Sequence, residues 1–186
     1  MNIFLSYGHD GNEELVKQLK ADLEARGHDV WFDKSEIKFG DDWRRAITDG
    51  ILASDWMFSF LSKHSTRDPG VCLDEVSIAL GVKGGIVSTI LVENEKEVVP
   101  PVSISHIQWL DMHEWKKHWN QNKHAPLQDG WYKEKFDEIV RVIESDVNRR
   151  FAGEIDNLKK ILMPLPSDAS IGSFSKQGFE GRQWLL

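Results

Sequence analysis

Glu75 is the residue whose surroundings most directly suggest chemistry. Helical spacing across residues 68–80 places Glu75 on what is otherwise an apolar stripe. Its neighbours on that stripe are Val71, Cys72, Ala79 and Val82. An ionised carboxylate there must be paired, protonated or open to a cleft, because burying it alone is costly. A carboxylate beside a cleft is typical of a catalytic group, whereas pairing with a Lys or Arg, or a place at the stripe's edge, would make Glu75 structural.

Strands and helices that alternate along the chain must position this carboxylate. Apolar runs predict strands at residues 2–7, 30–32, 56–61 and 86–92, and a short fifth strand within 104–110. Between them, periodic apolar residues predict a helix ending at Gly27, a second over residues 43–52, and the helix that carries Glu75. Asp10 with Glu13 predicts a capping box for the first helix, and Asp68 predicts the cap of the Glu75 helix.

This alternation predicts an α/β fold with a parallel sheet covered by helices on both faces. Ligands of such sheets bind beyond the carboxyl ends of the strands. The loops at residues 6–12, 33–42 and 62–70 are therefore the expected site region. Glu75 follows the last of these loops.

Residues 111–130 contain three histidines and two tryptophans: His113, His118, His124, Trp115 and Trp119. A metal or nucleic-acid surface is one interpretation, but the histidine spacing does not place the rings on one helix face. A surface insertion anchored by buried tryptophans is favoured. The pattern over 131–162 then predicts a long amphipathic helix, and Pro, Ser and Gly at 164–178 indicate a linker. Gly153 argues against a coiled-coil stalk.

Length, net charge and cysteine count limit the classes of function that this chain can have. The chain has 186 residues, enough for one well-cored domain, and a net charge of -7, which argues against nucleic-acid binding as its main role. Its single cysteine, Cys72, excludes an intrachain disulfide and fits a reducing compartment. No signal peptide or membrane-length apolar run is recognised, so we expect a cytoplasmic protein without a membrane partner.

Four segments, taken in order, resemble the Toll/interleukin-1 receptor (TIR) domain over roughly residues 1–148. They are Ile3-Phe4-Leu5-Ser6-Tyr7, the loop 33–43, Phe60-Leu61-Ser62, and Cys72-x-x-Glu75. The resemblance implies a flavodoxin-like three-layer sandwich with a central parallel five-stranded sheet. It also implies an NAD+ glycohydrolase in which Glu75 is catalytic, NAD+ is substrate rather than cofactor, and no metal is needed. Cleavage of the nicotinamide–ribose bond passes through an oxocarbenium-like state, and neutral nicotinamide needs no general acid, so one carboxylate suffices.

The resemblance also implies substrate contacts. They fall at Ser6, Tyr7, Gly8, Asp33, Ile37, Gly40, Trp43, Ser62 and Cys72. Tyr7 has an alternative as a core aromatic, Trp43 as a first-turn helix anchor, and Ser62 as a turn residue. Many enzymatic members carry Trp four residues before the glutamate, where this chain has Val71. Either Trp43, Phe39 or Tyr7 stacks on nicotinamide instead, or activity is weaker or differently directed.

The last nine residues, 178–186, resemble the entry segment of signal-transducing NTPases of the STAND or NACHT type. We therefore expect a TIR domain at 1–148, a helical extension at 149–163, a linker at 164–178 and the start of an NTPase at 179–186. The resemblance implies an N-terminal effector of bacterial antiphage immunity, silent until TIR domains self-associate. The product would be ADP-ribose or a cyclic isomer.

Three other functions compete with this hypothesis. Some TIR domains only assemble with one another, and Val71 favours such an interaction module while Glu75 favours the enzyme. A nucleoside deoxyribosyltransferase has a glutamate nucleophile on a related fold. A phospho-acceptor receiver domain would need an Asp at the end of the third strand, where this chain has Ser62 and Lys63.

Overall fold

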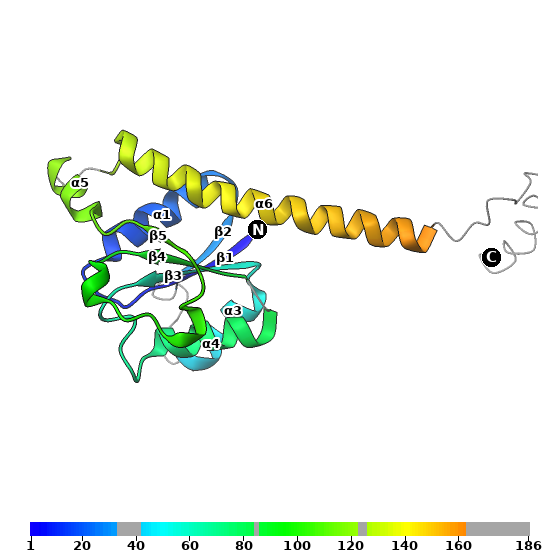
Figure 1. Ribbon diagram of the computed structural model, residues 1–186, viewed down its shortest axis with the longest axis horizontal. Coiled ribbons are helices and arrows are strands. Elements are labelled where there is room, and N and C mark those ends of the chain that lie inside the picture. Colours follow the sequence, from blue (N-terminus) through cyan, green and yellow to red (C-terminus); the bar gives the residue numbers. More distant parts are fainter. Residues whose placement is uncertain (33–41, 84–85, 123–125, 163–186) are drawn as a thin grey trace, which may run out of the picture. The chain divides into compact units, whose positions relative to one another are not determined.

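The computed structural model describes residues 1–32, 42–83, 86–122 and 126–162. Its centre is a five-stranded sheet in the order β2-β1-β3-β4-β5, with every neighbouring pair parallel (Figure 1). The strands are β1 (Asn2–Ser6), β2 (Asp29–Phe32), β3 (Trp56–Leu61), β4 (Val87–Leu91) and β5 (Trp109–Asp111). The predicted α/β fold with a flavodoxin-like parallel sheet is confirmed.

The strands are apolar along their length because both faces of the sheet are covered. All six residues of β3 are buried, including the polar Ser59. The register places Leu5 of β1 opposite Phe32 and Phe58, and Ser6 opposite Ser59. Burial on both faces removes the alternation of apolar and polar residues that a one-sided sheet would show. Ser6 therefore ends the central strand β1 at the carboxyl edge of the sheet.

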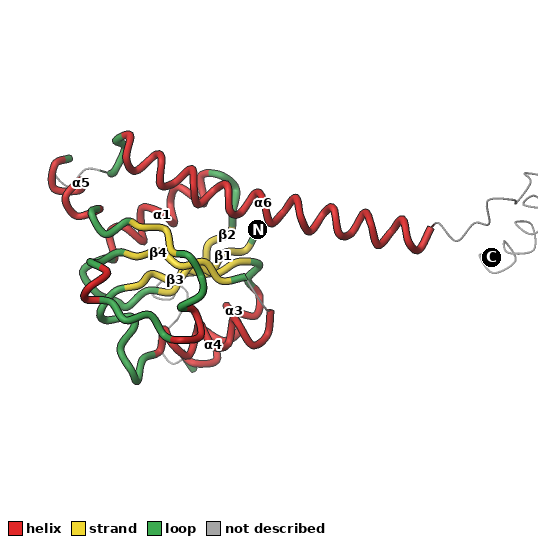
Figure 2. The backbone as a smooth tube through the Cα atoms, viewed as in Figure 1, coloured by secondary structure: helices red, strands yellow, loops and turns green. Residues whose placement is uncertain are grey.

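Helices cover the two faces (Figures 1 and 2). The helices α1 (Glu13–Ala25) and the start of α6 (Gly130–Leu162) lie on one face, and α3 (Trp43–Ala53) and α4 (Val71–Lys83) lie on the other. The core beneath α3 and α4 contains Phe4, Ile47, Ile51, Met57, Val76 and Ala79. Because Ile47 and Ile51 face Val76 and Ala79 across this core, the two helices lie side by side. This pairing forms the cleft described below.

Contact clustering separates residues 1–140 from residues 141–186. Within the first unit, α6 contributes the buried side chains of Tyr132, Phe136, Ile139 and Val140. The Tyr132 hydroxyl donates to Asp22 Oδ2 over 2.5 Å. Burial, together with this carboxylate, raises the pKa of Tyr132 far above its ordinary value. The predicted helix over 131–162 is confirmed, while the expected linker and NTPase segment lie outside the described residues.

Three local predictions were wrong. The first helix begins at Glu13 with Asn12 as its N-cap, because Asp10 instead accepts hydrogen bonds from the backbone amide and side-chain amide of Asn12. Asp68 does not cap α4, which begins at Val71 after the carbonyl of Gly70 accepts the first helical amides. The fifth strand begins only at Trp109, because residues 102–104 form a 3-10 turn.

The insertion after β5 is ordered around its tryptophans, as expected. Helix α5 (Trp115–Gln121) buries Trp115, whose Nε1 donates to Asn12 Oδ1 over 3.0 Å. The His118 ring stacks on Trp131 at 4.2 Å between centroids and contacts Asp129 through Nδ1 at 2.7 Å. His118 thus has structural neighbours, and His124 lies outside the described residues. Among the described helices, none is long and apolar enough to cross a membrane.

Candidate functional site

Glu75 is buried, with 4% of its surface exposed, on the side of α4 that faces the sheet. The hydroxyl of Ser6, itself 2% exposed, donates to Glu75 Oε2 over 2.5 Å. A charge-assisted hydrogen bond of this kind is about twice as strong as a neutral one, and it favours the ionised carboxylate. The last residue of β1 therefore fixes one oxygen of Glu75, although the two residues lie 69 positions apart.

Glu75 also lines a cleft between α3 and α4 of about 390 Å³. The lining residues are Trp43, Arg44, Ile47, Thr48, Val71, Asp74, Glu75, Ser77 and Ile78. This volume lies in the range of roughly 300–1,000 Å³ that is usual for small-molecule sites. A buried carboxylate that opens onto a cleft is one of the arrangements expected for Glu75. The apolar stripe itself is shorter than predicted, because Val82 is 58% exposed.

Trp43 and Val71 face the same cleft as Glu75. Trp43 is the first residue of α3 and is 41% exposed, so its indole is only partly packed. Asp42 caps this helix by accepting a hydrogen bond from the Arg45 amide. The cap fixes where α3 starts and thereby places Trp43 at the mouth of the cleft. Trp43 is thus both a first-turn residue and an aromatic surface available to a ligand.

Arg44 provides the positive charge of the cleft. Its guanidinium carbon lies 5.2 Å from the centre of the Trp43 ring, a cation–π distance. Asp74, exposed in the first turn of α4, lies on the opposite helix beside Glu75. The cleft therefore combines an aromatic face, a guanidinium, an exposed carboxylate and a buried carboxylate. Such a mixture suits a ligand that carries a cationic ring together with anionic groups.

The other predicted contacts lie around Glu75 rather than in the cleft lining. Tyr7 is 3% exposed and stacks on Phe32 at 5.2 Å between ring centroids, the core-aromatic alternative. The Cys72 thiol donates to the Tyr7 carbonyl over 3.3 Å. A Cβ at the buried Gly8 would approach the Ser65 amide to 2.9 Å, so this position requires glycine. The Cys72 contact holds the end of β1 against α4.

Ser62 follows β3 and lies where the strand order reverses, between β1 and β3. Its hydroxyl donates to Asp10 Oδ2 over 2.5 Å and accepts from the Ser65 amide over 3.0 Å. With 1% of its surface exposed, Ser62 holds two loops together. The expected contacts Asp33, Ile37 and Gly40 lie outside the described residues, as does Phe39.

Comparison with known proteins decides the family. The TIR domain family model matches residues 3–127, which is more than half of the chain. This chain belongs to the TIR domain family. A solved TIR domain agrees in fold: that of the Toll-related receptor TRR-2 from Hydra magnipapillata superposes with a TM-score of 0.52 at 17% identity, covering 64% of this chain and 95% of that one.

Two similar TIR relatives are enzymes by name. The NAD(+) hydrolase TcpA of Theionarchaea archaeon (strain DG-70-1) is 32% identical over 63 residues, which are 34% of this chain and 19% of that protein. The 2′ cyclic ADP-D-ribose synthase BtTIR of Bacteroides thetaiotaomicron is 28% identical over 71 residues, 36% of this chain and 25% of that protein. The matches thus span about a fifth to a quarter of the relatives' length.

Sequence reasoning missed several residues of the TIR cleft. Arg44 and Thr48 lie one turn apart on α3, and Asp74, Ser77 and Ile78 lie one turn apart on α4. Helical spacing from Glu75 would have selected Ile78 of this set. What the spacing could not show is that the two helices face each other.

Proposed function

We propose that this TIR domain cleaves the nicotinamide–ribose bond of NAD+, with Glu75 as the catalytic carboxylate. The observation that carries the proposal is the Glu75 site itself: a carboxylate 4% exposed, bonded to Ser6 and opening onto the cleft that contains Trp43. The enzymatic names of the similar TIR relatives support the choice of NAD+ as substrate.

The proposed reaction requires one negative charge from the protein, placed near the ribose. As the glycosidic bond breaks, nicotinamide takes the bonding electrons and leaves as a neutral molecule, and positive charge develops on the ribose. The Glu75 carboxylate stabilises this charge, and burial strengthens the interaction because the local dielectric is low. Water then adds to the anomeric carbon and releases a proton, giving ADP-ribose. Attack by a hydroxyl of the same molecule would give a cyclic isomer.

Trp43 takes the place of the aromatic that is missing at Val71. Both residues line the cleft with Glu75, and the indole of Trp43 is the aromatic face there. We propose that it stacks on the nicotinamide ring, a cationic aromatic before cleavage and a neutral one after it. Arg44, held beside the indole, then faces the diphosphate. Serine and threonine side chains in the cleft remain for the ribose hydroxyls.

We further propose that the enzyme is active when TIR domains self-associate, as the effector of an immune protein with an NTPase of the STAND or NACHT type. The resemblance to bacterial TIR enzymes supports this role. Residues 178–186, on which the NTPase expectation rests, lie outside the described residues. A non-catalytic TIR–TIR module and a nucleoside deoxyribosyltransferase are the alternatives that the following experiment separates.

The experiment follows NAD+ loss and nicotinamide release by the protein alone and after fusion to a trimerising domain. Glu75→Gln keeps the size of the side chain but removes its charge, so we expect turnover to fall at least a hundredfold. Glu14→Gln, at an exposed position on α1, is the matched control and should keep full activity.

Equal turnover by the wild type and Glu75→Gln would remove Glu75 from its role. Absence of turnover in every clustered form would favour the interaction module. Cleavage of nucleosides without cleavage of NAD+ would favour the transferase. Chromatography of the products distinguishes ADP-ribose from a cyclic isomer.

A further inference from the structure

A second cleft, of about 680 Å³, lies at the carboxyl edge of the sheet and shares no lining residue with the Glu75 cleft. Its charged and imidazole lining residues come from the segments after β3, β4 and β5: Lys63, His64, Arg67, Glu93, Glu97, His113 and Lys116. Ligands of open α/β sheets usually bind at this edge. In this chain the side chains of Asp10 and Ser62 occupy the position between β1 and β3 where the strand order reverses. The second cleft lies beside them, at the ends of β3, β4 and β5. We call it the basic cleft.

The lysines and the arginine of the basic cleft are not ion-paired with carboxylates in the part of the chain that the structure describes. Among the described residues, no carboxylate forms an ion pair with Lys63, Arg67 or Lys116. Lys116 instead lies 5.5 Å from the centre of the Trp115 ring. Because the whole chain has a net charge of -7, a group of cations in one cleft is a local feature and does not reflect a generally basic surface.

The carboxylates of the cleft offset this charge only in part. Glu93 Oε1 accepts from the Asn12 side chain over 3.2 Å, and Glu93 Oε2 accepts from the Lys63 backbone amide over 2.8 Å. Glu93 therefore ties the loop after β3 to the loop after β4. Glu97 is the second carboxylate of the lining. Three permanent cations thus face two carboxylates, one of which already accepts a hydrogen bond on each oxygen.

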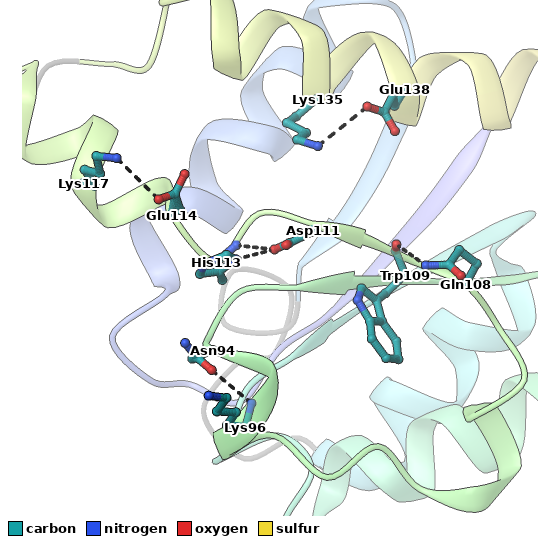
Figure 3. Close-up of polar contacts among 10 residues, drawn as sticks. All are labelled: Asn94, Lys96, Gln108, Trp109, Asp111, His113, Glu114, Lys117, Lys135 and Glu138. Atoms are coloured by element: carbon teal, nitrogen blue, oxygen red, sulfur yellow. Dashed lines mark hydrogen bonds and ion pairs between the residues drawn. The ribbon is translucent and has the colours of Figure 1, made fainter.

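The two imidazoles add hydrogen-bonding groups of known orientation. Arg67 Nη1 donates to His64 Nδ1 over 2.9 Å; because an arginine only donates, the ring proton of His64 lies on Nε2. His113 Nδ1 contacts Asp111 Oδ1 at 2.6 Å, so Nδ1 is the protonated nitrogen there (Figure 3). Burial opposes ionisation of Asp111, but the hydrogen bonds from His113 outweigh it and lower the pKa of this carboxyl. His113 is thereby fixed on the segment after β5.

We propose that the basic cleft binds the phosphate groups of a small organic phosphate. An arginine fork, two lysines and imidazole donors around a hollow are the groups that recognise phosphate oxygens. The volume suits a nucleotide rather than an isolated ion. The proposal does not depend on Glu75, because the two clefts have separate linings.

The test measures binding of ADP and of pyrophosphate to the whole chain by calorimetry, with the site located by amide NMR shifts. Arg67→Gln combined with Lys116→Gln should weaken both probes at least tenfold, because each variant removes a charge-assisted contact. The matched control, Lys17→Gln combined with Lys133→Gln, removes two exposed charges outside the cleft and should bind normally. Equal affinity for the two probes indicates recognition of the diphosphate alone, and tighter ADP binding indicates a nucleotide.

Glu75→Gln should keep its affinity for ADP, so failure of this proposal and failure of the NADase proposal are distinguishable. The proposal is overturned if neither probe binds at millimolar concentration, or if the double variant binds as tightly as wild type. Shifts confined to α3 and α4 would place the ligand in the other cleft instead. Binding of single-stranded RNA in clear preference to ADP would assign the surface to nucleic acid.

Discussion

Ser6→Ala isolates the positioning of Glu75 from its charge. The substitution removes the hydroxyl that donates to Glu75 Oε2 and leaves the carboxylate, the cleft and the strand in place. A hydrogen bond to a charged group contributes about 1.5–3 kcal/mol net. If the proposed transition state depends on this orientation, kcat should fall by about 10- to 150-fold, since 1.36 kcal/mol corresponds to a tenfold change. KM should change little, because the proposed substrate contacts line the cleft and Ser6 does not.

The division of the effect between kcat and KM separates this role from a general loss of stability. A serine that positions Glu75 acts on the reacting carboxylate, so Ser6→Ala should lower kcat while KM and the midpoint of thermal unfolding change little. A merely structural serine would lower the midpoint of thermal unfolding instead. The assay is nicotinamide release by the clustered protein over a range of NAD+ concentrations, with thermal unfolding measured alongside.

Thr89→Val provides the matched control. Thr89 is 2% exposed on β4, and its hydroxyl has no hydrogen-bond partner among the described residues. Replacing it with an apolar group of the same shape should leave activity unchanged and stability equal or higher. A positioning role for Ser6 is refuted if Ser6→Ala keeps wild-type kcat, or if Thr89→Val loses activity to the same degree.

Three further predictions concern the cleft and the fold. Trp43→Ala should raise KM for NAD+ about 5- to 150-fold while Trp43→Phe largely preserves it, because stacking on a base contributes roughly 1–3 kcal/mol. An unchanged KM in both variants excludes Trp43 as the stacking surface. A Cβ at Gly50 would approach the Trp31 indole to 2.9 Å, so Gly50→Ala should destabilise in urea titrations, whereas Gly81→Ala, with open space, should stabilise by up to about 1 kcal/mol. Burial opposes ionisation of Asp129, but hydrogen bonds from a backbone amide and an imidazole outweigh burial and lower the pKa of this carboxyl. The contribution of Asp129 to stability should therefore be present above about pH 4 and be lost as the pH falls further. A stability difference between wild type and Asp129→Asn that persists at pH 2 contradicts this.

Local patterns were enough to predict the order of strands and helices. Buried parallel strands are apolar along their whole length, and helices repeat every 3.6 residues, so both leave a signal that needs no distant contact. The first residue of each helix was harder to predict. Asp10 and Asp68 both have the residue type of an N-cap, but Asp10 is hydrogen-bonded to Ser62, and α4 begins three residues after Asp68. The side chain of Asp10 is thus taken by a tertiary partner, which local spacing does not encode.

The sequence by itself determined that Glu75 is a carboxylate on an apolar helix face, and that this helix follows a strand whose end lies at the ligand edge of a parallel sheet. Only the tertiary structure decided what surrounds it. Ser6 contacts Glu75, and Trp43 lines the same cleft, because β1 and α3 pack beside α4 although these residues are far apart in the chain. Helix pairing depends on how side chains interlock in three dimensions, so the cleft is a property of the folded molecule.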